Sequence, residues 1–133
     1  MHLIVCIDDR DGMSFCGRRL SRDRELNAHI LKLTAGRNLW MSAYSAKLFP
    51  NAVVMEDEAF LYKAGPDDYC FAETVQLPAT CENIGSLTLY CWNRSYPATV
   101  KFPRELLKSM RLESSEEFSG HSHERITVER YVK

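Results

Sequence analysis

The last third of the chain, residues 86–133, constrains the fold more than any other segment. It begins with an apolar run at residues 86–92, which predicts a buried strand. Residues 110–118 and 124–132 alternate as strands do and flank a polar turn at residues 119–123, a layout that predicts an antiparallel hairpin. Polar and apolar side chains are not cleanly sorted between the two faces of the final strand, so we also expect an exposed edge.

The first half of the chain has a different layout, in which short apolar runs alternate with helical patterns. Residues 3–7 form a continuous apolar run that ends in a polar turn, and such a run predicts a central strand covered on both faces. Further strands are expected at residues 39–41, 52–55 and 69–73, and residues 74–85 are expected to form a loop. Strands that alternate with helices predict parallel β-α-β units.

The clearest helical pattern follows Ser21, which we expect to cap the helix. Asp23 and Glu25 then lie in its first turn, where acidic side chains are favoured by the helix dipole, and Gly36 is a natural stop. Shorter helices are expected within residues 42–49 and 56–64, and a turn at residues 104–109. Together these elements predict an α/β protein with a mixed sheet, parallel in its first half and closed by an antiparallel C-terminal hairpin.

The composition of the chain limits which classes of function are expected. The 133 residues predict a single domain spanning residues 1–133, and a net charge of −1 gives no reason to expect nucleic-acid binding. No apolar run approaches the roughly 20 residues that a membrane helix needs, so no membrane partner is expected. The five cysteines form no C-x-x-C pair and there is no signal peptide, which favours a reducing, cytoplasmic location.

The order of these elements resembles that of dihydrofolate reductases. Residues 87–90, then Phe102-Pro103 and an S-E-E-F segment at residues 115–118, are similar to that family's last three strands. Residues 1–5 and 39–42 resemble its first two parallel strands. The resemblance covers most of the chain by order and spacing, and it implies a dihydrofolate reductase-like fold.

The chain departs from that family where the cofactor would bind. The family carries a Gly-Gly pair after a late parallel strand, and residues 74–85 are too short for the strand, turn and helix expected there. The family's arginine after the second strand is also missing, since the turn here is Ser42-Ala43-Tyr44-Ser45. We therefore expect no cofactor and no NADPH-dependent reduction, although Ser45 could still cap a helix or bind a phosphate.

The resemblance implies one candidate catalytic residue. The family places an acidic residue on its first helix facing the pterin, and Asp23 is the nearest match. The alternative is that Asp23 and its neighbour Glu25 are ordinary first-turn acids that stabilise the helix.

The chain is also similar to a small uncharacterised bacterial family often labelled ribonuclease Z. That activity would need an H-x-H-x-D-H cluster around two zinc ions, and the sequence has no such cluster, so we do not expect it. His121 and His123 are the only ligand-like pair, next to Glu124. Two imidazoles in a Ser/Gly-rich turn fall short of the three or four ligands that zinc requires, so no metal site is predicted, and metal binding by this pair stays open.

An arginine-rich segment lies between the first strand and the first helix. Ligands of α/β folds bind beyond the carboxyl ends of the strands, where arginines can hold phosphate or carboxylate groups. The alternative is a solvated loop balanced by nearby aspartates. The candidate ligand-binding residues are Arg18, Arg19, Arg22, Ser42 and Ser45.

The sequence leaves more than one function open. Our leading hypothesis is a catalytically reduced dihydrofolate reductase-like domain that binds a small anionic ligand or a protein partner, the latter by strand addition at an exposed edge. The alternative is an enzyme acting on a nucleotide or related small molecule in the crevice near Asp23 and the arginine-rich loop.

Overall fold

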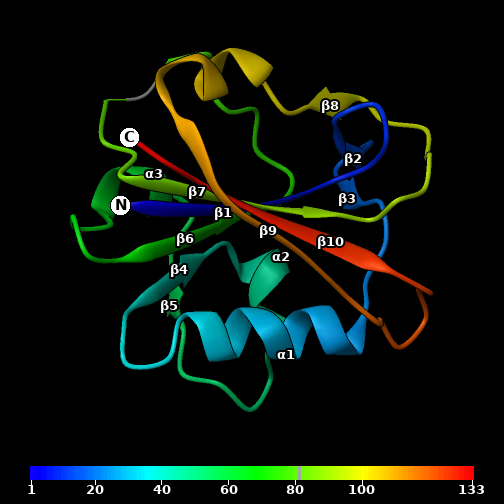
Figure 1. Ribbon diagram of the computed structural model, residues 1–133. Helices are drawn as coiled ribbons and strands as arrows, with labels where there is room; N and C mark the ends of the chain where they lie inside the picture. Colours follow the sequence, from blue (N-terminus) through cyan, green and yellow to red (C-terminus); the bar gives the residue numbers. More distant parts are fainter. Residues whose placement is uncertain (81) are drawn as a thin grey trace.

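A computed structural model describes residues 1–80 and 82–133, which form two sheets (Figure 1). The larger sheet has seven strands in the order β5-β4-β6-β1-β7-β10-β9, and the smaller has three in the order β3-β2-β8. The large sheet contains β1 (His2–Ile7), β4 (Leu39–Met41), β5 (Met55–Glu56), β6 (Tyr69–Ala72), β7 (Ser86–Cys91), β9 (Arg111–Phe118) and β10 (Ile126–Val132). The small sheet contains β2 (Gly12–Phe15), β3 (Arg18–Arg19) and β8 (Val100–Lys101).

Strand β1 occupies the centre of the large sheet, as its apolar run predicts. It pairs in parallel with β6 on one side and β7 on the other, so that His2 lies opposite both Tyr69 and Ser86. Strand β4 is parallel to β6 and β5. The parallel first half of the sheet is therefore confirmed, and five neighbouring strands direct their carboxyl ends to one edge.

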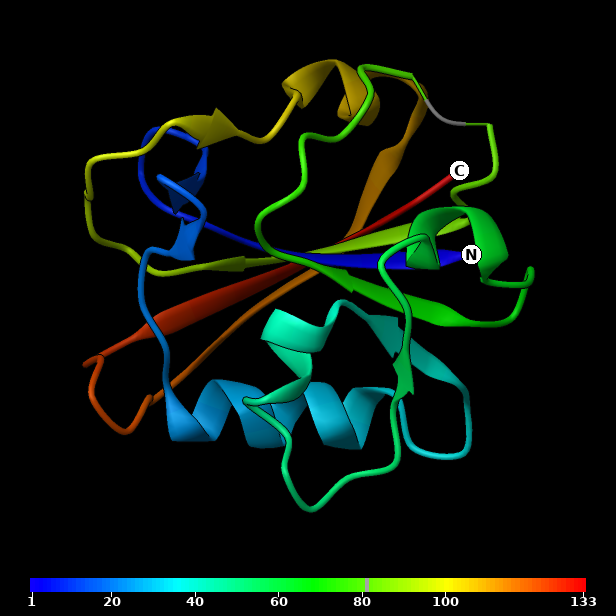
Figure 2. The same ribbon diagram turned by 180° about the vertical axis from the view of Figure 1, so that it is seen from behind.

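The two faces of the large sheet are covered by different elements. Helices α1 (Arg24–Leu33) and α2 (Ala43–Ala46) lie on one face, and the small sheet and the 3₁₀ helix η1 (Arg104–Ser109) lie on the other (Figures 1 and 2). Alternate residues of β1 serve the two cores: Leu3 packs in the same cluster as Phe60 of α3 (Phe60–Lys63), and Ile4 in the cluster that contains Ile30 of α1.

The C-terminal hairpin also has the predicted form. Strand β10 pairs antiparallel with both β7 and β9, which makes β9 the outer strand of the sheet. Residues 111–117 are all exposed, in keeping with the expected exposed edge. The mixed sheet and its antiparallel end are confirmed.

Local boundaries differ from the predictions in three places. The predicted cap of α1 at Ser21 is wrong, because the Asp23 carboxylate accepts the amides of Glu25 and Leu26 and the helix starts at Arg24. Strand β5 has only two residues in place of residues 52–55. Helix α3 begins at Phe60 and not at residue 56, because Asp57 accepts the amide of Ala59 and turns the chain there.

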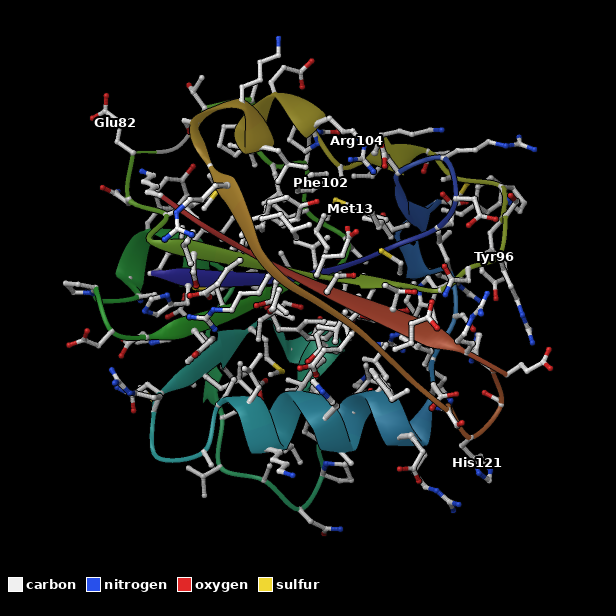
Figure 3. The ribbon with its side chains drawn as sticks, in the orientation of Figure 1. Met13, Glu82, Tyr96, Phe102, Arg104 and His121 are labelled. Atoms are coloured by element: carbon white, nitrogen blue, oxygen red, sulfur yellow. The ribbon has the colours of Figure 1, made fainter. Side chains whose placement is uncertain are left out.

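The arginine-rich segment holds a hairpin that the sequence analysis missed. Cys16 and Gly17 have positive φ values of 49° and 79°, and this left-handed turn reverses the chain between β2 and β3. Met13 of β2 and Phe102 beyond β8 extend into the space between the small sheet and the large one (Figure 3). Within the described residues no helix is both long and apolar enough to cross a membrane, and Cys81 lies outside those residues.

Candidate functional site

The carboxyl ends of the parallel strands bring polar residues to one edge of the sheet. Asp8 follows β1, Ser42 follows β4 and Glu73 follows β6. In open α/β sheets ligands bind at this edge, near the place where the strand order reverses. Two clusters of polar side chains lie there, one around Glu73 and one around Asp23.

The first cluster is a buried ion pair between Arg19 of β3 and Glu73. Nε and Nη2 of Arg19 donate to the two carboxylate oxygens of Glu73 at 3.0 and 3.1 Å, and their side chains are 17% and 6% exposed. Ser45 Oγ donates to Glu73 Oε1 at 2.8 Å. The Arg19 guanidinium stacks on Tyr44, 4.2 Å from the ring centre. Both charges are thus satisfied within the protein.

Glu73 directly follows β6 and precedes residues 74–85, the segment in which the sequence analysis expects the family's cofactor loop to be missing. Thr74 is the first residue of that segment. A cavity of about 170 Å³ adjoins them and is also lined by Glu58 and Ser42. Two carboxylates beside so small a space repel a phosphate group.

The second cluster joins the start of α1 to the turn between β9 and β10. Asp23 Oδ1 accepts the amide of His121 at 2.9 Å, in addition to the two helix amides that it caps. Its Oδ2 accepts the amides of Ser122 and His123 and Nδ1 of His123, the last at 2.9 Å. Burial alone would raise the pKa of Asp23, but hydrogen bonds from His121, His123 and Ser122 outweigh it and hold the pKa well below its usual range.

Gly120 makes the close approach of this turn possible. A Cβ atom at Gly120 would lie 2.6 Å from the carbonyl oxygen of His123 and 2.7 Å from Oδ2 of Asp23. Those distances are shorter than any ordinary contact, so only glycine fits between the carboxylate and the turn.

The two histidines of this turn do not point the same way, because they lie in the turn and not on a strand. The side chain of His123 is 2% exposed and contacts Asp23, whereas His121 is exposed and its Nδ1 accepts from Arg24 at 3.0 Å. Figure 3 shows His121 at the tip of the turn, beside the first turn of α1. Across residues 1–80 and 82–133 no three His, Cys, Asp or Glu side chains are grouped so as to hold a metal ion.

A cavity of about 510 Å³, here called the basic pocket, opens between this turn, the start of α1 and the segment after α2. Arg22, Arg24 and Lys47 line it, and Asn27 and His121 add further hydrogen-bonding groups. Its one carboxylate is that of Asp23, whose side chain is 0% exposed and fully engaged with the turn. The exposed groups of the pocket are therefore mainly cations and hydrogen-bond donors.

The structure divides the predicted ligand-binding residues between these clusters. Arg19 and Ser45 bind Glu73, and Ser42 caps α2 by accepting the amide of Ser45. Arg22 lines the basic pocket, together with the predicted catalytic residue Asp23. Arg18 is exposed on β3.

Sequence reasoning did not identify Glu73, Lys47 or the partners of Asp23 in the distant turn. Glu73 had a usable signal, because it is a single charged residue directly after a buried strand. Nothing in the local pattern marked Lys47, and the contact between Asp23 and His123 spans 100 residues of sequence.

Comparisons with known proteins bear on the fold. No family model matches the chain, and no curated protein matches it at a significant level. Among solved structures, the chain is similar to a dihydrofolate reductase from Enterococcus faecalis complexed with NADP(H) and RAB-propyl, with a TM-score of 0.68 and 10% sequence identity. The match covers 98% of this chain and 94% of the reductase. The protein therefore has a dihydrofolate reductase-like fold.

Proposed function

We propose that this protein is a catalytically reduced dihydrofolate reductase-like domain that binds a small anionic ligand in the basic pocket. The observation that carries the proposal is the charge around that cavity. Three cationic side chains, those of Arg22, Arg24 and Lys47, surround a space of about 510 Å³, and the single carboxylate beside them is buried. A ligand with two negative charges would balance the excess left by three cations and one carboxylate.

Hydrogen-bond geometry supports an anion in particular. Arg24 can only donate, so Nδ1 of His121 accepts its hydrogen bond and Nε2 is the ring nitrogen that carries a proton. The N-terminus of α1, a helix of ten residues, adds the positive end of a helix dipole beside the same cavity. An anionic ligand would therefore meet donors from three separate segments of the chain.

The buried ion pair supports the loss of dinucleotide chemistry. Phosphate groups of a dinucleotide need glycines for close backbone approach and donors to receive their charge. Glu73 places a carboxylate directly after β6, and Arg19, the nearest cation, is already bound to it. For the same reason, the alternative of a nucleotide-converting enzyme in the crevice between the arginine-rich loop and Ser42 has less support.

Calorimetric titration with inorganic pyrophosphate, against sodium chloride of equal ionic strength, tests the proposal. We expect saturable binding that weakens about tenfold, or about 1.4 kcal/mol, when Arg22→Gln, Arg24→Gln or Lys47→Gln removes one cation. Arg37→Gln is the matched control, because Arg37 is an exposed arginine beyond the other end of α1. If binding does not saturate at about 10 mM pyrophosphate, the binding free energy is weaker than about 3 kcal/mol. That result would contradict an anion site in the basic pocket.

A protein partner is the second candidate, and exposed strand β9 favours it. All residues from 111 to 117 are exposed, and within residues 1–80 and 82–133 no strand pairs with the outer side of β9. The strand carries three acidic side chains, those of Glu113, Glu116 and Glu117, and one basic side chain, that of Arg111, so a basic strand would complement its charge. Slower hydrogen exchange of β9 amides on addition of a peptide of alternating lysine and valine would support this candidate, and unchanged exchange would count against it.

A further inference from the structure

Ser21, His123 and Asp23 form a continuous hydrogen-bonded chain that the anion-binding proposal does not use. Ser21 Oγ lies 3.0 Å from Nε2 of His123, and Nδ1 of the same ring lies 2.9 Å from Oδ2 of Asp23. The three residues come from the segment before α1 and from the β9–β10 turn. The order is that of a nucleophile, a base and a carboxylate that orients the base.

The direction of each hydrogen bond follows from Asp23. Its lowered pKa keeps this buried carboxylate ionised, so it can only accept, and Nδ1 of His123 must carry the proton. Nε2 is then the ring nitrogen left to accept a hydrogen bond. Ser21 donates to it at 3.0 Å, with the Tyr96 hydroxyl at 3.4 Å as a weaker second neighbour. The ring thus has the tautomer that a general base requires.

The imidazole is held firmly in this orientation. The His123 side chain is 2% exposed, and Trp92 packs on it with ring centres 4.6 Å apart. Ser21 itself is only half-buried, so its hydroxyl is closer to solvent than the ring that would activate it. Within the described chain, the backbone amides of Ser21 and Arg22 have no hydrogen-bond acceptor, which leaves them available to stabilise an oxyanion.

We propose that Ser21 is the nucleophile of an acyl-ester hydrolase, with His123 as its general base and Asp23 as the positioning residue. Ser21 Oγ attacks the ester carbonyl carbon while its proton moves to Nε2 of His123. The bond to the alcohol then breaks, and Nε2 returns the proton to the departing oxygen. Water attacks the acyl-serine and gives a proton to Nε2, which passes to Ser21 Oγ as the acid leaves. The balance is ester plus water to acid plus alcohol.

The inference is independent of the basic pocket, since the ester need carry no charge. A purely structural reading of the same contacts is that they fasten the turn to α1, and Ser21 would then be an ordinary serine. The two readings differ in the reactivity of Ser21 Oγ, which a structural hydrogen bond does not raise.

Labelling of the folded protein with a fluorophosphonate, followed by peptide mass spectrometry, tests that reactivity. We expect modification at Ser21 and hydrolysis of 4-nitrophenyl acetate whose kcat/KM falls at least about 100-fold in Ser21→Ala. Ser95→Ala is the matched control, because Ser95 is an exposed serine whose hydroxyl donates to Asp9 and contacts no histidine in the described chain, and both signals should persist in it.

Variants of the other two residues separate activation from folding. Circular dichroism first establishes that each variant protein is folded. In the folded His123→Gln and Asp23→Asn proteins, we expect the labelling of Ser21 to be slower than in the wild type. A folded wild-type protein with no label on Ser21 would overturn the proposal. So would hydrolysis unchanged in Ser21→Ala, or equal labelling rates in wild type and a folded His123→Gln protein.

Discussion

At the scale of single residues, Glu73 is a buried carboxylate whose charge is stabilised mainly by one oppositely charged side chain, that of Arg19. Removing Arg19 leaves the 6% exposed Glu73 carboxylate with the Ser45 hydroxyl as its one remaining side-chain hydrogen-bond partner among the described residues. We expect Arg19→Ala to lower the free energy of unfolding by about 3 kcal/mol, as for other broken buried pairs. Urea denaturation measures it, and Arg37→Ala, which breaks an exposed pair, should change it by no more than about 0.5 kcal/mol.

Asp23 gives a prediction about pH. Because hydrogen bonds in the fold lower its pKa, its stabilising contribution is fully present above the ordinary value of about 3.9 and is lost as pH falls through the lower folded value. We expect Asp23→Asn to cost about 3 kcal/mol at neutral pH, with the deficit shrinking below about pH 4. Urea denaturation across this range checks the trend, and a deficit that stays constant with pH would refute the assignment.

At the scale of elements, strand β7 contains a buried hydroxyl group, that of Thr88, which contributes no hydrogen bond to the described structure. Thr88 is 3% exposed, and its hydroxyl has no hydrogen-bond partner in the described chain. Thr88→Val keeps the shape and the β-branched side chain, so we expect a gain of about 1 kcal/mol in the free energy of unfolding. Thr34→Val is the control with the opposite sign, because the Thr34 hydroxyl donates to the carbonyl of Ile30 at 2.9 Å. We expect that variant to have a free energy of unfolding lower by about 1 kcal/mol.

The elements also show which parts of the molecule the sequence predicts. Residues 3–7 were predicted correctly because a continuous apolar run is typical of a strand covered on both faces, and the C-terminal hairpin because two strand-like segments flank a polar turn. Short elements such as β5 and the β2–β3 hairpin depend on turns and on a neighbouring sheet, which no local pattern encodes. For the same reason Asp23 was identified as a candidate catalytic residue and His123 as one of a ligand-like pair of histidines, but the contact between them, across 100 residues of sequence, was not predicted.

At the scale of the whole molecule, the sheet order and the 98% coverage by a reductase structure show that the scaffold is complete. Chemistry in such folds resides in the loops beyond the strands, so a complete scaffold carries no activity with it. Here the loop after β6 supplies a carboxylate, and the turn between β9 and β10 closes on Asp23. Both features lie at the carboxyl edge of the sheet, where ligands of open α/β folds bind.

The reductase reaction therefore provides the last prediction. With dihydrofolate and NADPH, we expect no loss of nicotinamide absorbance above the rate without protein, because the carboxylates of Glu58 and Glu73 line the small cavity after β6 and would repel a phosphate group there. The Enterococcus faecalis reductase, which has the similar fold, is the positive control under the same conditions. Steady NADPH oxidation that requires dihydrofolate would mean that the carboxylates move aside on binding, and the proposed loss of dinucleotide chemistry would then be wrong.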